Sequence, residues 1–173
     1  MKRLLVVILV AAGLWAGYWW IGASGVKSGF AAWLDARRAE GWVADSADIT
    51  VQGFPNRFDT TFTDIRLADP ETGWAWEAPF FQLFALSYRP NHVIAIWPRE
   101  HILATPVQKY AITSAEMQAS AVVGADTTLP LERANLVADT LSITDESGET
   151  TAMTALRLAV EKVEGSEATY HLG

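Results

Sequence analysis

The stretch that decides the fold is residues 74–88, WAWEAPFFQLFALSY. Successive side chains of a β-strand point to opposite faces of a sheet. On that period one face is expected to carry Trp74, Trp76, Ala78, Phe80, Phe84, Leu86 and Tyr88, interrupted by Gln82. The middle of the stretch is apolar on both faces, which predicts a strand that is covered on both sides. Pro79 has no N–H for a sheet ladder and therefore predicts a bulge, an edge or a break.

The residues before this strand also alternate. Ile49 and Val51 have polar neighbours, and the run GFPNRF at 53–58 is typical of a hairpin connection, with Pro55 second and Asn56 third in the turn. Apolar residues change parity between 62 and 65, which predicts a bulge near residues 63–64.

The residues after it predict a meander of further strands. We expect strands at 93–97, 102–104, 110–123, 131–144 and 151–163, with a turn at 145–148. A helix over 151–163 is an alternative, because Ala, Met, Leu and Glu favour helices. Residues 169–173 resemble the start of a strand, which would leave an open sheet edge. We therefore expect a shortened relative or a fragment of a longer protein.

The N-terminal residues predict a membrane segment. Lys2 and Arg3 precede the uncharged run Leu4–Ala23, LLVVILVAAGLWAGYWWIGA, which as a helix spans roughly 30 Å, the thickness of the bilayer core. Aromatic residues crowd its far end, as at a membrane–water interface. An uncleaved anchor is favoured over a signal peptide cleaved after Ala23 or Gly25, because the apolar run exceeds the usual 7–15 residues or so of a signal. The positive end should stay in the cytoplasm, which places the body in the periplasm of a bacterium with two membranes, either tethered or, after cleavage, secreted.

The residues after the anchor predict a short second helix. Ser28 is a candidate N-cap, and Gly41 is a candidate stop. We therefore expect a membrane anchor or signal at 1–23, a membrane-proximal helix at 24–41 and an exported antiparallel β domain at 42–173. The expected class is mainly β, with a meander sheet that is curved or groove-like in form and incomplete at the C-terminus.

Composition excludes several classes of function. The chain has no Cys, which removes disulfides, zinc–thiolate sites and Cys nucleophiles. It contains 13 Lys and Arg against 20 Asp and Glu, so without Lys2 and Arg3 the remainder has 11 against 20, a net charge of −9. An acidic body does not suit the phosphates of nucleic acids, and we expect no nucleic-acid partner.

The sequence contains no catalytic or cofactor-binding motif. His92, His101 and His171 lack the spacing of a metal site, and no Walker loop, GxGxxG or GxSxG occurs. We expect no enzyme, cofactor or metal. Arg57 is expected to order its turn, by pairing with Asp59, or to contact an anionic group.

The aromatic strand is the best candidate for function. Core packing is the usual fate of such residues, whereas an exposed apolar surface marks a lipid or protein contact. The candidate surface for an apolar ligand or partner consists of Trp74, Trp76, Phe80, Phe84, Leu86 and Tyr88.

Three motifs carry a family resemblance: Gly53–Phe58 (GFPNRF), Trp76–Pro79 (WEAP) and Tyr88-x-Pro90-Asn91-His92. In them the chain resembles a membrane-anchored alphaproteobacterial envelope family, a domain of unknown function with a GFPxRF-type motif. Members are generally longer. The resemblance implies an exported β-rich body and supplies no reaction. A more distant architectural likeness connects the chain to the AsmA-type β-groove proteins, which are associated with lipid homeostasis.

We therefore expect an inner-membrane protein, anchored by Leu4–Ala23, whose periplasmic β domain binds an apolar ligand such as lipid or maintains the envelope without catalysis. The alternative is a protein–protein interaction module of an envelope complex.

Overall fold

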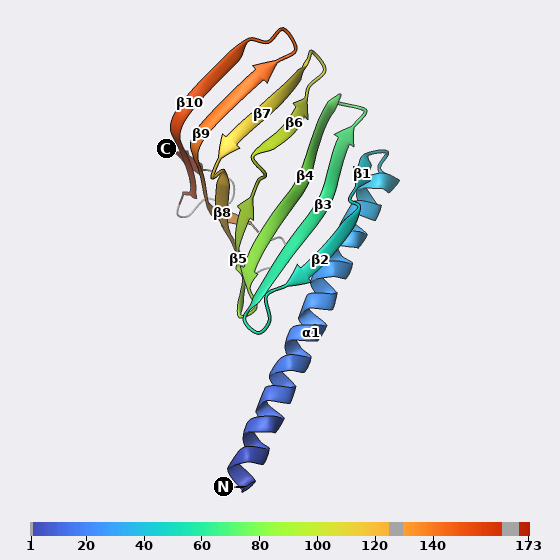
Figure 1. Ribbon diagram of the computed structural model, residues 1–173, viewed down its shortest axis with the longest axis vertical. Helices are drawn as coiled ribbons and strands as arrows, with labels where there is room; N and C mark the ends of the chain where they lie inside the picture. The colour runs from blue at the N-terminus through green and yellow to red at the C-terminus, as the bar shows by residue number, and fades with distance from the viewer. Residues whose placement is uncertain (1, 125–129, 164–169) are drawn as a thin grey trace.

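The computed structural model, which describes residues 2–124, 130–163 and 170–173, contains one helix and one antiparallel sheet. The helix, α1 (Lys2–Ala39), projects from a curved sheet of eleven strands (Figure 1). The strands are β1 (Val43–Asp45), β2 (Asp48–Gln52), β3 (Arg57–Asp69), β4 (Trp74–Leu86), β5 (Arg89–Ile96), β6 (Glu100–Ala104), β7 (Lys109–Ala115), β8 (Gln118–Val123), β9 (Leu131–Asp145), β10 (Thr150–Lys162) and β11 (Tyr170–Leu172). The predicted mainly β class and antiparallel sheet are confirmed.

The predicted membrane segment and the predicted second helix are one continuous helix. No proline precedes Pro55, so nothing in the sequence breaks the backbone ladder between the two. Ser28 was predicted as an N-cap, but it lies inside α1, where its hydroxyl donates to the carbonyl of Ser24 at 2.6 Å. The prediction failed because a serine that bonds the preceding turn is also compatible with a helix interior.

The predicted stop at Gly41 is correct. Gly41 has a φ of 92°, and its N–H donates to the carbonyl of Arg38. The N–H of Trp42 donates to the carbonyl of Arg37, which completes a Schellman motif. This turn sends the chain directly into β1, alongside the end of the helix.

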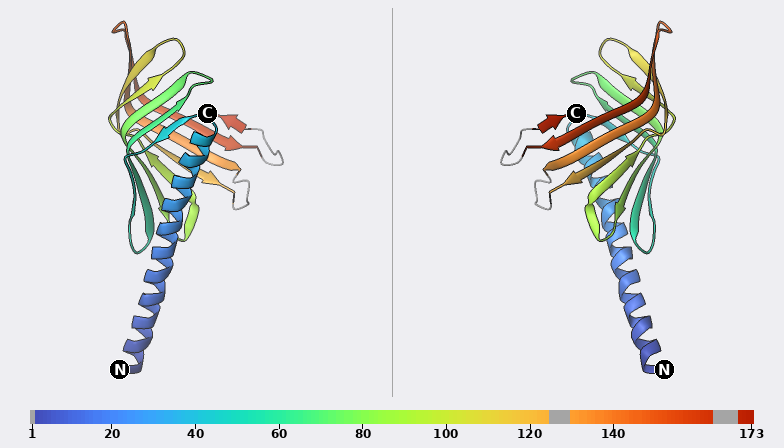
Figure 2. Two further views of the ribbon diagram at one scale, coloured as in Figure 1. Left: turned by 90° about the vertical axis from the view of Figure 1, so that its right-hand side faces the viewer. Right: turned by 90° about the vertical axis from the view of Figure 1, so that its left-hand side faces the viewer.

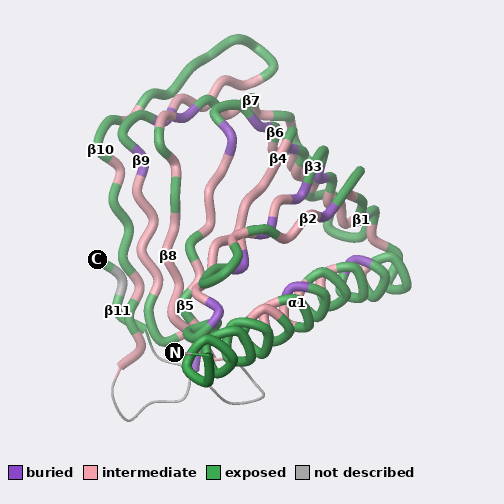
Figure 3. Tube along the Cα trace, turned by 60° about the horizontal axis from the view of Figure 1, so that its bottom comes forward, coloured by how far each residue is buried: buried purple, intermediate pink, exposed green. Residues whose placement is uncertain are grey.

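The sheet is a meander in which three strand positions are each filled by two short strands, the first by β1 and β2, which both pair with β3. Both β5 and β6 pair with β4, and both β7 and β8 pair with β9. The pairings of β4, β5, β8, β9, β7 and β6 consequently close a ring, and the sheet has a barrel-like curvature, with α1 alongside its concave side (Figures 2 and 3). The helix considered for residues 151–163 does not form; that segment belongs to β10, which pairs with β9 along its length.

A transverse crease bends every long strand of the sheet at the same level. Asp64, with a φ of 47°, is left unpaired opposite Pro79, while the register is unchanged on both sides. Ala155, with a φ of 54°, interrupts β10 opposite Asp139 in the same way. At this level the chain also leaves the sheet between the short strands β1 and β2, β5 and β6, and β7 and β8, at Ser46–Ala47, Trp97–Arg99 and Glu116–Met117. The interruption predicted at Pro79 is confirmed. The bulge predicted near residues 63–64 is instead a single unpaired residue, Asp64, with no change of register, and both features are parts of one bend.

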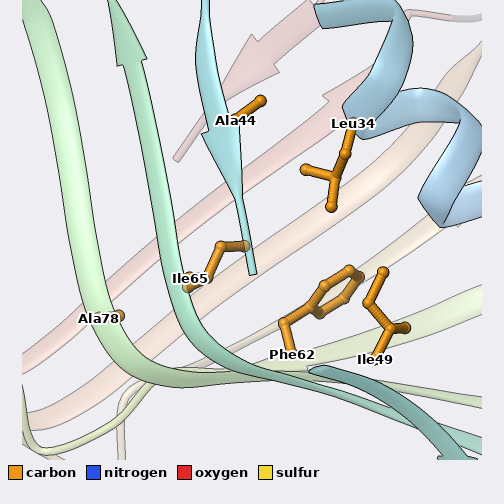
Figure 4. Close-up of a cluster of buried hydrophobic side chains, with 6 residues drawn as sticks. All are labelled: Leu34, Ala44, Ile49, Phe62, Ile65 and Ala78. Atoms are coloured by element: carbon orange, nitrogen blue, oxygen red, sulfur yellow. The ribbon is translucent and has the colours of Figure 1, made fainter. Parts of the chain in front are cut away.

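The core lies where α1 packs on the first strands. Leu34 of α1 points at Phe62 of β3, with Ile49 and Ile65 on either side (Figure 4). The rings of Phe30 and Phe62 meet edge to face, with centroids 5.0 Å apart. Burying each such side chain contributes about 1.5–3 kcal/mol, which fixes the C-terminal half of α1 to the sheet.

Candidate functional site: an apolar trough inside the sheet

The crease divides the aromatic strand between the two faces of the sheet. Trp76 and Ala78 lie on the inner face, which faces α1, and so does Phe81, whose ring centroid is 5.4 Å from that of Trp76. Phe80 is opposite Thr63 and lies on the outer face. The prediction that the whole stripe shares one face is therefore wrong, because alternation is lost at Pro79 and resumes with the opposite parity.

The six candidate residues consequently do not form one surface. Trp74 and Trp76 are on the inner face above the crease, where they border a small hollow with Trp42. Phe84 and Leu86 are on the outer face with Phe80. Tyr88 lies beyond the end of β4 and is 60% exposed.

Below the crease, the inner face has two cross-strand rows made wholly of apolar residues. The first row runs from β4 through β5, β8 and β9 to β10: Leu83, Ala95, Ala119, Leu136 and Leu158. The second row crosses the same strands: Ala85, Val93, Ala121, Ala134 and Val160. Half of these side chains are alanines, so the floor of this surface is flat. We call the two rows together the trough.

The outer face of the same strands is mixed in character. One outer row reads Phe84, Ile94, Ser120, Asn135 and Ala159, and the next reads Gln82, Ile96, Gln118, Val137 and Arg157. A face that only meets solvent in an antiparallel sheet is commonly of this kind. The apolar character of the inner face therefore requires a covering.

α1 covers only one side of the trough. Its backbone approaches β1, β2 and β3 and, in the part of the chain that the structure describes, no other strand. All ten trough residues remain partly accessible, and Leu158 is exposed. Figure 3 shows these strands arching away from the helix. The trough is thus an apolar surface without a described partner.

A groove of about 410 Å³ lies where the trough meets the helix, which is within the range of small-molecule sites. Its helix wall is formed by Val26, Gly29, Phe30 and Trp33, and its sheet wall by Phe58, Thr60, Leu83, Ala85, Pro90 and Val93. Thr60 alone among these ten has a polar side chain, and it is buried. Leu83, Ala85 and Val93 belong to both groove and trough, so the two are continuous.

The GFPNRF motif forms the end of the β2–β3 hairpin and holds it against α1. The indole Nε1 of Trp19 donates to the carbonyl of Arg57 at 2.7 Å, and that of Trp15 donates to the carbonyl of Pro55 at 3.0 Å. Phe54 meets Trp19 edge to face, with centroids 5.5 Å apart. Pro55 is the third residue of its turn rather than the second, because the N–H of Asn56 donates to the carbonyl of Gly53.

Arg57 orders the outer side of this hairpin. Its guanidinium donates to the carboxylate of Asp59 at 2.6 Å and lies 5.7 Å from the ring centroid of Phe84. The pairing with Asp59 that the sequence suggested is present. Contact with an external anion stays a prediction.

The β4–β5 hairpin is held in the same way. The hydroxyl of Tyr18 donates to the carbonyl of Ser87 at 2.8 Å. Phe58 packs against Gly22, where an added Cβ would lie 2.6 Å from its Cζ. The helix residues between Trp15 and Gly22 therefore form one docking surface for both hairpin ends.

A second hollow, of about 630 Å³, lies along the crease and has a polar lining that includes Asp64, Glu77, Glu100 and His101. Burial lowers the pKa of His101, although the carbonyl of Pro98 opposes this. Within the described ranges no three His, Cys, Asp or Glu side chains gather closely enough to hold a metal ion.

The pKa values of two aspartates in the turns at the far end of the sheet are also lowered. The hydroxyl of Thr72 lowers that of Asp69, and the hydroxyl of Ser147 lowers that of Asp145. Both carboxylates accept hydrogen bonds from backbone N–H groups of their own turns. These two aspartates therefore have a structural role.

Comparison with protein families gives one match. The model of a family described as uncharacterized proteins conserved in bacteria, DUF2125, matches residues 19–172. The chain belongs to this family. The DUF2125 match covers the whole sheet and begins at Trp19, inside the apolar part of α1. Comparison with curated proteins found no match, and comparison with solved structures found none.

The trough was not recognised in the sequence, although part of its signal was there. A single strand over residues 110–123, as predicted, would put Ala119 and Ala121 on the same face as Ala111 and Thr113. Glu116, with a φ of 52°, separates β7 from β8, and the parity changes there. Glutamate is not typical of positive φ, so this change had no marker in the sequence.

Proposed function

We propose that this DUF2125 protein is a membrane-anchored periplasmic binding protein without catalytic activity, which accommodates lipid acyl chains in the trough and contributes to envelope maintenance. The two apolar rows across β4, β5, β8, β9 and β10 carry the proposal. An apolar surface of this extent on a soluble sheet face is costly unless something covers it.

An acyl chain fits the surface better than a polar or compact ligand. The trough offers no described hydrogen-bonding side chain, since its ten residues are all apolar. Its rows run across the strands, so the apolar path is long and narrow. The groove at its edge is walled by the continuation of the apolar helix, which gives a lipid chain an uninterrupted apolar route.

Retention of the N-terminal segment is part of the proposal. α1 is long and apolar enough to cross a membrane, a test that a signal sequence also meets. Cleavage after Ala23 would remove Trp15, Tyr18 and Trp19, all of which donate hydrogen bonds to the sheet. It would also remove Gly22 from its contact with Phe58. These contacts favour an uncleaved anchor.

The location of the body and the likeness to AsmA-type β-groove proteins belong to the same proposal. Lys2 and Arg3 favour a cytoplasmic N-terminus, which would put the sheet on the opposite side of the membrane. The AsmA-type likeness and the proposed function share one feature, a curved sheet that shields acyl chains from water.

The test is photo-cross-linking in vesicles made with a phospholipid that carries a diazirine near the end of one acyl chain. The full-length protein should be labelled on peptides that contain Ala119–Val123 and Ala134–Ala138. Ala121→Trp, which fills the trough, should reduce this labelling several-fold. Ser120→Trp places the same side chain on the outer face of the same strand and should leave the labelling unchanged.

Equal labelling of both faces, or no difference between the two variants, would refute lipid binding in the trough. If a stoichiometric protein co-purifies in mild detergent and is lost in Ala121→Trp, the trough is instead the docking surface of an envelope protein, the alternative function.

A further inference from the structure

We infer that the ends of the β2–β3 and β4–β5 hairpins, Gly53–Asn56 and Ser87–Pro90, are immersed in the membrane leaflet on the side of the body. We call these two segments the hairpin tips. The inference rests on the anchoring part of the proposed function. It assigns a lipid surface as the partner of a region to which no role has been given.

The first argument is the length of helix that lies free of the sheet. The contacts of α1 with the tips begin at Trp15 and Tyr18. The segment before them, Lys2–Leu14, is about 20 Å long at about 1.5 Å per residue. The hydrocarbon core is about 30 Å thick. The free segment is therefore too short to span the bilayer with the whole sheet outside it.

The second argument is the position of the charges on the helix. The uncharged run Leu4–Ala23 has the length of the core, and Lys2 and Arg3 limit how far the helix can move toward the body's side. With these charges at one interface, the last third of the run lies in the opposite leaflet. That third, from Trp15 to Gly22, is the docking surface of the tips (Figure 1).

The third argument is the composition of the tips. Phe54 is 57% exposed and Tyr88 is 60% exposed, and the ring of Phe54 meets that of Trp19 edge to face. Aromatic side chains favour this interface. Although the chain is acidic, neither tip contains Asp or Glu. Arg57 follows the first tip and Arg89 lies within the second, and both side chains can extend to lipid phosphates while their stems stay in apolar surroundings.

Immersion has a consequence for the groove. Its lining includes Phe58, which lies close after the first tip, and Pro90, the last residue of the second tip. The mouth of the groove would then open within the leaflet. A lipid chain could enter sideways from the membrane without crossing water.

Single-cysteine labelling tests this inference directly, because the natural chain has no Cys. Spin labels at Phe54→Cys and Tyr88→Cys are compared in proteoliposomes with labels at Val10→Cys, within the free helix, and at Val107→Cys in the turn between β6 and β7. Val107 is 87% exposed and lies at the opposite end of the sheet. The measured quantity is the collision rate with oxygen relative to that with a water-soluble nickel chelate.

We expect this ratio to be several-fold higher at residues 10, 54 and 88 than at residue 107. Tyr88 has an exposed side chain, so its variant stays informative even if Phe54→Cys loosens the contact with Trp19. Aqueous labels at 54 and 88 together with a lipid-exposed label at 10 would overturn immersion and leave the anchor intact. An aqueous label at 10 would overturn the anchor and the immersion together.

Discussion

At the scale of single residues, close packing between α1 and the hairpin tips depends on Gly22. The ring of Phe58 occupies the space that any Cβ at residue 22 would need. Phe58 is itself buried and packs against Trp19, with centroids 6.1 Å apart, so it has little freedom to move. Gly22 therefore sets how closely the sheet approaches α1.

Gly22→Ala should destabilise the protein. Crowding of a packed ring costs about 1–3 kcal/mol, which exceeds the gain of about 1 kcal/mol in helix propensity. Gly25→Ala is the matched control, because nothing lies within 4 Å of a Cβ there, and it should stabilise the helix. Thermal unfolding in detergent micelles measures both; each kcal/mol corresponds to about 2–4 °C for a chain of this size. A higher melting temperature for Gly22→Ala would contradict the close contact.

At the scale of elements, the crease shapes the sheet. In every long strand, the alternation of side chains between the two faces is interrupted at one level. Residues three apart, such as Phe62 and Ile65, therefore both face the core. A regular alternation would have turned half of these apolar side chains outward. The bend also tips the two halves of the sheet toward each other, and this makes the inner face concave.

The crease predicts opposite effects of glycine at two alanines of β10. Ala155 has a φ of 54°, which costs an L-residue about 1–2 kcal/mol, so Ala155→Gly should stabilise the protein by about 1 kcal/mol. Ala159, also exposed but in regular pairing with Asn135, is the control. Ala159→Gly should destabilise by about 0.5–1 kcal/mol. Denaturant midpoints compare the two; equal losses in both variants would argue against the bend at Ala155.

At the scale of the whole molecule, the apolar helix and the sheet are one structural unit. α1 continues from the apolar run to Leu34 in the core, and both hairpin tips bond to its middle. The orientation of the trough relative to α1 is consequently fixed by packing rather than left to a flexible linker. If α1 is the anchor proposed above, the same packing fixes the trough relative to the membrane.

This unity predicts that the N-terminal segment is retained in cells. Intact-mass measurement of the protein purified from a bacterial membrane should give the chain with Lys2 and Arg3 present. The protein should stay in the membrane pellet after an alkaline carbonate wash. A mass that corresponds to a start at Ser24 would show cleavage, and would refute both the anchor and the immersion of the tips.

Sequence reasoning predicted the class of the fold because alternation and turn residues are local signals. Pro79 marked its break, and Gly41 marked the end of the helix. It misplaced the candidate surface because face assignments depend on every residue between two points keeping the same alternation. Within the candidate surface Pro79 interrupts that alternation, and elsewhere Glu116 and Ala155 interrupt it without a residue type that signals it. The family resemblance, by contrast, was correct at the level of an uncharacterised bacterial family.

By itself, the sequence determined an apolar N-terminal helix and an acidic body of antiparallel strands, because hydrophobic period and length are properties of neighbouring residues. Only the tertiary structure decided which apolar side chains gather on one surface. Residues as distant as Ala85 and Val160 become members of one row through strand pairing. Only it showed that the GFPNRF turn contacts the apolar part of α1, because the indoles and carbonyls that bond there are separated by some forty residues of chain.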